Sequence, residues 1–191
     1  MDADRVRAEL LALAGLATAT AGQADQLVAI ARQYQETLRG GGSLFFAGNG
    51  GSAADAQHIA AEYLVHYRRD RGPLPAIALT TDSSVLTAAG NDLGFEQIFA
   101  RQVEAFCRSR DLLILHSTSG KSANLLAAAR TARAKGIPVV AFLGKGGGEL
   151  AGLADLAFVV ASDDTSRIQE LHLAAEHIVA GLVEDGEAAG G

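Results

Sequence analysis

The chain divides into two parts by the spacing of its apolar residues. Over residues 2–39 the apolar positions recur at helical spacing, with Gly22 between two runs and a glycine triplet at 40–42 after the second. This pattern predicts two extra N-terminal helices within residues 1–40, ahead of the first strand. Their alanine-rich faces suit packing against a neighbouring subunit, although a face that covers the chain's own sheet fits the same pattern. We expect oligomer packing.

From residue 43 onward, short runs of consecutive apolar residues alternate with longer amphipathic segments. The short runs indicate strands buried on both faces of a parallel sheet, at 43–48, 75–80, 111–117, 138–144 and 156–161. The longer segments predict helices at 52–67, 95–108, 120–135 and 165–184. This order is typical of an α/β protein with a doubly wound five-stranded parallel sheet of the flavodoxin-like type.

Length and composition favour a single domain over residues 1–191. The 191 residues are 49% hydrophobic, which is enough for one sizeable core, placed by the pattern at 43–184. Residues 185–191 are glycine, alanine and acidic residues with little to bury, so we expect a flexible tail.

Charge and cysteine content narrow the functional classes. The formal net charge of -6 provides no basic field for nucleic acid or an anionic membrane surface, so neither partner is expected. The chain has one cysteine, no recognisable leader and no apolar run long enough to span a membrane, which predicts a cytoplasmic protein without disulfides. Cys107 follows Phe106 in an amphipathic segment and is expected to be a core filler without a catalytic role.

Two strand–turn–helix units resemble each other, and both turns are rich in small residues. In an open parallel sheet the carboxyl ends of the strands meet at one rim, so both turns should border the same site. The second turn, HSTSGKSAN, places hydroxyl groups around Gly120 at a predicted helix start: Ser117, Thr118, Ser119 and Ser122. Helix capping would explain one of them. Four favour a site for a phosphate monoester, with the role of Lys121 left open.

The first turn, GNGGSA, matches the G-x-G-x-x-A pattern of dinucleotide-binding proteins. Such a site also needs an acidic residue at the end of the second strand. The nearest candidates, Asp70 and Asp82, are poorly placed. A nicotinamide-dependent oxidoreductase therefore remains a distant alternative.

The helix after the first turn carries His58 and Glu62, four residues apart and so on nearly the same helix face. Such a pair is often an inert surface feature, but it can also hold a metal ion or act as acid and base. Gln169 and His177, eight residues apart on an otherwise apolar helix, form a second polar set. If the two sets meet, two nitrogens and two oxygens would suit zinc, with other divalent ions left open. His66 and His172 are expected to be solvated or capping residues.

Taken together, these motifs resemble the phosphoheptose isomerases, which are built on the sugar isomerase (SIS) domain. The resemblance rests on GNGGSAADAQH, AGND at 89–92, STSGKSAN, GKGGGELAGLAD at 144–155, and RIQELH with His177, and it covers nearly the whole chain. Ala53 stands where some members of the family have a histidine. His116 is not fixed by the family motif and receives no role.

The resemblance implies an aldose–ketose isomerase that converts sedoheptulose 7-phosphate into D-glycero-D-manno-heptose 7-phosphate through an enediol, the first step of nucleotide-activated heptose biosynthesis. It implies a homotetramer with active sites between subunits and one Zn²⁺ per subunit. The metal ligands carried over by motif are His58, Glu62, Gln169 and His177. The substrate contacts carried over are Asn49, Gly50, Gly51, Ser52, Asn91, Asp92, Ser117, Thr118, Ser119, Ser122 and Gln169.

The isomerisation needs a base and an acid, and Glu62 and His177 are the titratable groups expected to act as them. The alternative is a non-catalytic protein of the same domain, like the initiator-associating protein that binds DnaA. That protein lacks the acid and the histidine at the positions that match Glu62 and His177, so an enzyme is favoured. Sugar-phosphate regulators built on this domain usually add a DNA-binding segment, for which this chain leaves no room.

Overall fold

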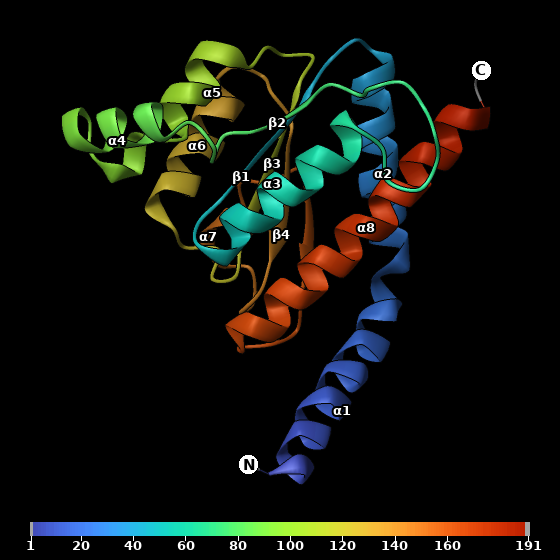
Figure 1. Cartoon of the computed structure of the whole chain (residues 1–191). Helices are drawn as coiled ribbons and strands as arrows, with labels where there is room; N and C mark the ends of the chain where they lie inside the picture. The colour runs from blue at the N-terminus through green and yellow to red at the C-terminus, as the bar shows by residue number, and fades with distance from the viewer. Residues whose placement is uncertain (1, 190–191) are drawn as a thin grey trace.

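A computed structural model describes residues 2–189 and shows a five-stranded, all-parallel sheet at the centre (Figure 1). The strand order is β2-β1-β3-β4-β5, which is the flavodoxin-like order. The strands are β1 (Leu44–Gly48), β2 (Ala76–Ala78), β3 (Leu112–Ser117), β4 (Val139–Leu143) and β5 (Leu156–Val159). The predicted fold class is confirmed, and so is each predicted strand, although the edge strands β2 and β5 are shorter than expected.

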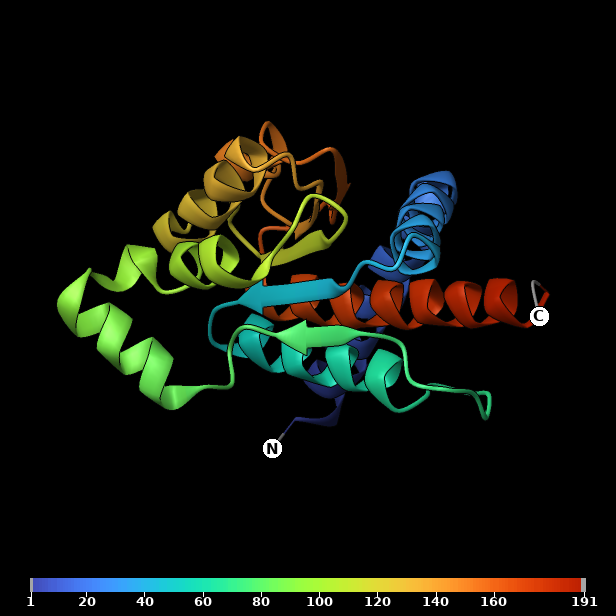
Figure 2. The same cartoon turned by 90° about the horizontal axis from the view of Figure 1, so that it is seen from above.

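Helices cover both faces of the sheet (Figure 2). One face packs against α2 (Ala24–Arg39), α3 (Gly51–Leu64) and α8 (Thr165–Ala189). The other packs against α5 (Ala100–Phe106), α6 (Ala123–Ala134) and α7 (Gly148–Ala151). Because successive side chains of a strand point to opposite faces, Phe46 and Ile114 enter the first core while Phe45 and Leu113 enter the second.

The burial of the strands explains why their sequences are continuously apolar. Every residue of β1, β3 and β4 is buried, since each of these strands has a neighbour on both edges and a helical layer on both faces. The edge strand β2 is less protected, and its Ile77 is 51% exposed. A continuous run of apolar residues is therefore a clearer signal for the three central strands than for the edge strands.

The two N-terminal helices are confirmed, but they differ in their packing. A short 3-10 turn at Ala21–Gln23, next to the predicted break, separates α1 (Ala3–Thr20) from α2. Helix α2 buries one side against the sheet, whereas α1 has no buried residue and projects from the body of the molecule (Figure 1). Leu10 and Leu11 of α1 are more than 60% exposed. Thus α2 covers the chain's own sheet, whereas α1 touches the core only through the partly buried Leu13 and Leu16 and leaves Leu10 and Leu11 exposed.

The sequence analysis missed α4 (Ser83–Asp92), and it joined two elements between 95 and 108 into one helix. Helix α4 is capped by the Asp82 carboxylate, which accepts a hydrogen bond from the Val85 N–H at 3.0 Å. Only Ala89 of this helix is buried, so it has no apolar periodicity to detect. The later segment is divided into a 3-10 turn, Phe95–Gln97, and helix α5.

The prediction that the last helix ends at 184 was wrong, because α8 continues to Ala189. Residues beyond 184 pack against α2: Arg39 donates to the Gly186 carbonyl at 2.9 Å and pairs with Glu187 at 3.2 Å. Glu184 itself is buried, and its carboxylate accepts bonds from the backbone N–H groups of residues 67–69. Residues 190–191 of the predicted flexible tail lie outside the described residues.

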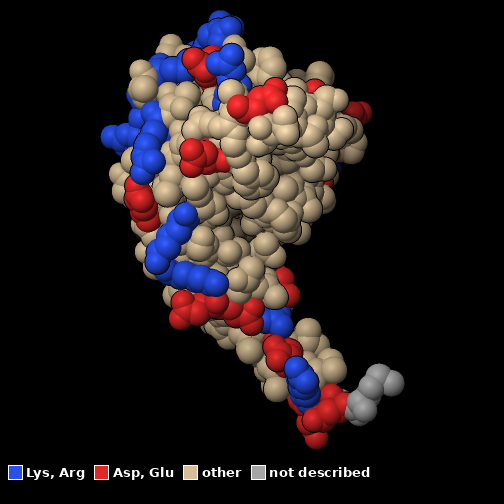
Figure 3. Space-filling model, turned by 90° about the vertical axis from the view of Figure 1, so that its left-hand side faces the viewer, with Lys and Arg blue, Asp and Glu red and all other residues tan. Residues whose placement is uncertain are grey.

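Figure 3 shows one face on which basic side chains gather at the top and along the left edge, with acidic side chains among them and a wide uncharged area beside them. No helix among residues 2–189 is long and apolar enough to cross a membrane.

Glu184 should be a main source of acid sensitivity in this fold. Burial alone would raise its pKa, but the N–H groups of residues 67–69 and the Arg71 guanidinium outweigh that effect and hold the pKa below its usual range. A carboxyl whose pKa is lower in the folded state stabilises the fold above its unfolded pKa. That contribution is lost as the pH falls through the folded pKa.

Replacing Glu184 by Gln should therefore destabilise the protein by about 3 kcal/mol at neutral pH, because it leaves the partly buried Arg71 side chain without its counter-charge. The loss of stability between neutral pH and about pH 3 should also become smaller than in the wild type. Urea unfolding at several pH values measures both effects. A variant as stable as the wild type at pH 7 would show that the carboxylate charge contributes nothing there.

Candidate functional site

A polar cavity of about 270 Å³ lies at the carboxyl ends of β1 and β3, where the strand order reverses. Both predicted turns border it, together with the start of α8. Its lining residues are Asn49, Gly50, Gly51, Ser52, His116, Ser117, Thr118, Ser122, Thr165 and Gln169. The two glycine and serine turns therefore meet at one rim, as the sequence predicted.

The first turn has a backbone that only glycine fits well. Gly50 adopts φ 55° and ψ -122°, and a Cβ at Gly51 would lie 2.7 Å from the Gln169 Nε2 atom. No side chain caps α3 at Gly50, so the free N–H groups at the start of this helix remain available beside the cavity. This geometry allows a ligand oxygen to approach the backbone closely.

In the second turn, the hydroxyl groups do not cap helix α6. Ser122 occupies the N-cap position but makes no capping bond, while Ser117 Oγ accepts from the Gly120 N–H at 3.0 Å and Ser119 Oγ from the Lys121 N–H at 3.2 Å. Capping alone therefore does not explain this serine cluster. Ser117, Thr118 and Ser122 line the cavity, whereas Ser119 and the exposed Lys121 are not among its lining residues.

Gly120 lets the serine turn pack tightly against the loop that precedes α7. Its φ is 62°, and a Cβ there would lie 1.8 Å from the Gly147 carbonyl oxygen. The Gly120 carbonyl in turn accepts from the Leu150 N–H at 3.0 Å. The glycine-rich stretch at 144–155 thus packs against the serine turn and helps to hold its backbone in place.

A pair of asparagines joins the two turns, and the sequence analysis missed one of them. Asn49 Nδ2 donates to Asn124 Oδ1 at 2.9 Å, and Asn124 Nδ2 donates back to Asn49 Oδ1 at 2.8 Å. Asn124 is 2% exposed. Because both ends of the Asn49 amide are occupied in this way, the side chain holds the cavity wall together. The signal for Asn124 was present in the sequence, as the last residue of STSGKSAN.

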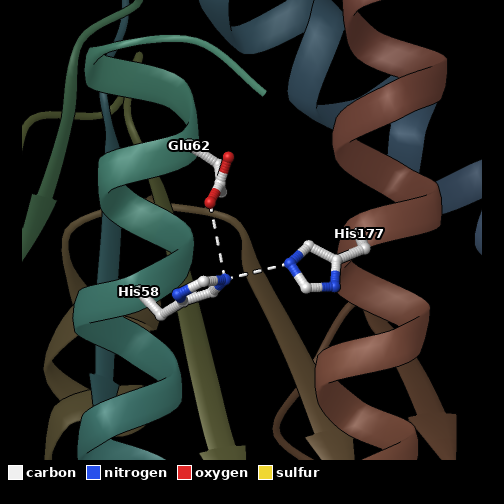
Figure 4. A group of neighbouring side chains, drawn as sticks. All are labelled: His58, Glu62 and His177. Atoms are coloured by element: carbon white, nitrogen blue, oxygen red, sulfur yellow. Dashed lines mark hydrogen bonds and ion pairs between the residues drawn. The ribbon is translucent and has the colours of Figure 1, made fainter. Parts of the chain in front are cut away.

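His58, Glu62 and His177 form the second part of the site (Figure 4). His58 Nε2 lies 2.9 Å from His177 Nε2 and 3.4 Å from Glu62 Oε1, and one ligand atom from each residue lies within 4.8 Å of the others. Helix α3 supplies the first two residues and α8 the third. Burial lowers the pKa of His177, and the neighbouring His58 lowers it further. The sequence analysis expected His58 and Glu62 to meet Gln169 and His177, and three of these four residues, His58, Glu62 and His177, do lie together.

Gln169 lies on α8 too, but its amide is directed to the first turn. Its Nε2 is 3.4 Å from Ser52 Oγ, and it is separated from His177 by eight residues, or about 12 Å along the helix. Gln169 therefore joins the polar cavity in this structure, and its part in a metal site stays a prediction.

Asn91 and Asp92 lie outside the cavity. They end α4, are exposed, and bond to each other at 2.7 Å. Figure 1 shows α4 at the far side of the molecule from α8. Within one chain, these two residues are not brought together with the other predicted substrate contacts.

A buried polar group lies between the sheet and α8, and the sequence analysis assigned no role to its members. His116 Nε2 is 2.9 Å from Glu176 Oε1, and the Tyr34 hydroxyl donates to the same carboxylate at 3.3 Å; all three side chains are fully buried. The expectation for His172 was wrong, because it is also fully buried, with its Nε2 3.0 Å from the Leu143 carbonyl. Burial lowers the pKa of His172 to about 3.

Two smaller expectations are confirmed. His66 is exposed. Cys107 is fully buried, and burial raises the pKa of its thiol to about 12, so it remains un-ionised in the core.

The three residues in Figure 4 fit a divalent metal ion by their chemistry. Two imidazole nitrogens and a carboxylate oxygen lie within 4.8 Å of one another, and this is a ligand set found in zinc sites. Nitrogens that share a tetrahedral zinc ion lie about 3.3 Å apart. His58 and His177 would therefore need to separate by only a few tenths of an ångström.

Comparison with known proteins assigns the chain to a family. The SIS domain family matches residues 12–144. The phosphoheptose isomerase of Roseiflexus sp. (strain RS-1) is 55% identical over 162 residues, which cover 85% of this chain and 82% of that protein. The phosphoheptose isomerase of Burkholderia pseudomallei (strain K96243) is 52% identical over 183 residues, which cover 96% and 89% respectively.

Solved structures agree with the sequence relatives. The phosphoheptose isomerase GmhA from Neisseria gonorrhoeae superimposes with a TM-score of 0.91 at 36% identity, covering 95% of this chain and 98% of that one. A phosphoheptose isomerase from Francisella tularensis gives a TM-score of 0.93 at 34% identity, covering 97% and 100%.

The asparagine pair offers a test of how the two turns are held together. Replacing Asn124 by Ala leaves the Asn49 amide without its partner and should destabilise the protein by about 1–3 kcal/mol, as measured by urea unfolding. The control is Lys121→Ala, which changes an exposed residue at the same turn and should leave stability unaltered. Equal stability of the Asn124 variant and the wild type would show that the pair has no net effect.

Proposed function

Since the chain belongs to the SIS domain family and matches phosphoheptose isomerases over most of its length, we propose that it converts sedoheptulose 7-phosphate into D-glycero-D-manno-heptose 7-phosphate. This aldose–ketose isomerisation is the first step toward nucleotide-activated heptoses. The observation that carries the proposal is the combination of a serine-lined cavity with a His58–Glu62–His177 group supplied by α3 and α8, two helices that also border that cavity.

The sugar phosphate would bind along the cavity rim. The start of α6 and the hydroxyl groups of Ser117, Thr118, Ser119 and Ser122 are proposed to hold the dianionic phosphate, since a helix N-terminus favours negative charge. The backbone of the first turn, at Gly50 and Gly51, with Ser52 and Gln169, would contact the sugar oxygens. Binding at both turns fixes the opened chain of the sugar between them.

The reaction moves a carbonyl group from C2 to C1. Glu62 is proposed to remove a proton from C1, and the C2 carbonyl oxygen gains a proton to give the enediol. His177 is proposed as the acid that then delivers a proton to C2, while the hydroxyl at C1 loses its proton and becomes the new carbonyl. Protons only change places, so no redox cofactor takes part.

We propose that His58, Glu62 and His177, with Gln169 as fourth ligand, hold one Zn²⁺ per subunit. When bound, the ion supplies Lewis acidity at the sugar carbonyl. For Gln169 this role requires a different side-chain rotamer from the one directed at Ser52.

A homotetramer is proposed as the working assembly. Helix α1 has no buried residue, and an apolar cavity of about 360 Å³ lies between α1, α2 and α8, with Ile178 54% exposed beside it. A neighbouring subunit would cover these surfaces, and Asn91 and Asp92 at the end of α4 would reach the substrate of another chain. A cytoplasmic location is proposed with it, because sugar phosphates are formed inside cells.

The non-catalytic alternative, a protein resembling the initiator-associating protein that binds DnaA, is not favoured. The relatives that match this chain at about half identity are phosphoheptose isomerases. The acid and the histidine expected to be missing from an interaction protein are both present here, and Glu62 and His177 lie within one group.

The proposal predicts a specific labelling result. When protein loaded with zinc is incubated with sedoheptulose 7-phosphate in deuterated water, NMR should show a manno-heptose 7-phosphate with deuterium at C2, because the proton at C2 comes from a group that exchanges with solvent. Chelator-treated protein should form none, and added zinc should restore the product. Absence of product from the zinc-loaded protein would argue against the isomerase.

Glu62→Gln should lower kcat by at least about 100-fold, since the amide is not a base. Circular dichroism and unfolding should remain as in the wild type. A matched control is Glu104→Gln, which changes an exposed carboxylate on α5 and should keep full activity. Near wild-type turnover by Glu62→Gln would remove this residue from the mechanism.

A further inference from the structure

The imidazole of His177 is in contact with two other rings. It meets His58 edge to face, with ring centroids 5.1 Å apart, and it lies parallel to the Tyr67 ring, with centroids 5.2 Å apart and planes 7° from parallel. Parallel, offset rings at this separation attract each other, and their overlap restricts rotation of the smaller ring. Tyr67 therefore limits the directions in which the His177 nitrogens can point.

Among residues 2–189, no protein group forms a hydrogen bond with His177 Nδ1 that would fix the ring in the same way. A histidine that binds a metal normally donates its second ring N–H to a carboxylate, a carbonyl or water, which fixes both tautomer and orientation. Within residues 2–189, His177 Nε2 faces His58, and no protein partner is found for Nδ1. The Tyr67 ring is thus the contact available to hold the plane of the imidazole.

Helix α8 itself determines where Tyr67 lies. Counting from His177, Gly181 is four residues on and Glu184 seven, so all three share one side of the helix. The Glu184 carboxylate accepts the Tyr67 N–H at 2.8 Å, and Tyr67 Cε1 would be 3.7 Å from a Cβ at Gly181. Figures 1 and 2 show this loop after α3 running beside α8.

The Tyr67 ring also has a charged neighbour. The Arg68 guanidinium carbon lies over it, 4.8 Å from the ring centroid, and adds a cation–π attraction that holds the ring in place. The backbone of Arg68 is bound by the same Glu184 carboxylate, at 2.9 Å. Ring and backbone of this segment are therefore both anchored next to His177.

We propose that Tyr67 is a positioning residue for His177: its ring, seated over Gly181 and anchored through Glu184, holds the imidazole with Nε2 directed at His58 and Glu62. This inference rests on the proposed role of His177 in the metal and catalytic site. Tyr67 acts through His177 and takes no part in the proton transfers.

The test compares three variants at position 67 in the zinc-loaded enzyme. Tyr67→Leu removes the aromatic face and should lower both the zinc affinity and kcat by about tenfold. The zinc affinity is measured by competition with a chelator. The KM for sedoheptulose 7-phosphate should stay within about twofold of the wild-type value, because the serine turn that is proposed to hold the phosphate does not contact Tyr67. Tyr67→Phe keeps the ring and should restore both values, whereas Tyr67→Ala should resemble the leucine variant.

Substitutions at Gly181 provide a second approach that leaves Tyr67 intact. Gly181→Ala places a methyl group at an ordinary contact distance from the ring and should behave as the wild type. Gly181→Leu should push the ring away and reproduce the loss of zinc affinity. Thermal unfolding of each variant identifies one that merely fails to fold.

The outcomes separate this inference from the proposed function. Unchanged zinc affinity and kcat in Tyr67→Leu, while His177→Ala loses both, would overturn the role of Tyr67 and leave the site intact. If His177→Ala keeps both, the site assignment fails and the inference fails with it. A lowered melting temperature in Tyr67→Leu with unchanged zinc affinity would show that Tyr67 is only structural.

Discussion

The packing of α8 against α3 and the sheet is the contact on which the site depends. Helix α8 is the last element of the chain, and it brings His177 to the two residues of α3 and Gln169 to the first turn. Neither helix could form the site alone, since α3 supplies His58 and Glu62 while His177 and Gln169 come from α8. The two parts of the site lie about two turns apart along α8, at a spacing set by the helix itself.

The buried polar group beneath α8 fixes how this helix is turned. Glu176 points to the sheet and contacts His116 on β3, while the next residue, His177, points to α3. Consecutive side chains on a helix project about 100° apart, so the contact of Glu176 with β3 also sets the direction of His177. Burying a carboxylate and a histidine is costly, and apolar residues of similar volume often stabilise a core better. The contact between Glu176 and His116 thus accounts for the orientation of α8.

The sequence predicted those features that depend on local pattern. The central strands are apolar at each position, and His58 with Glu62 could be recognised from a spacing of four residues. Contacts between distant segments could not be obtained in this way. Helix α8 is apolar on several sides, and the pattern did not show that His172 faces the core or that the Gln169 amide is directed to Ser52 in the first turn. Helix α4 went unnoticed because it buries almost nothing.

In the proposed tetramer, the folding of helix α1 would depend on protein concentration. Helix α1 has 18 residues and no buried side chain, so it gains little from tertiary packing, which supplies most of the stability of helices in proteins. Leu13 and Leu16 contact the first core, whereas Leu10 and Leu11 are exposed and would be covered only in the proposed tetramer, so the order of this segment would be linked by mass action to association. On dilution, the first twenty residues would then unwind before the sheet does, and the two events would be separate transitions of the same molecule.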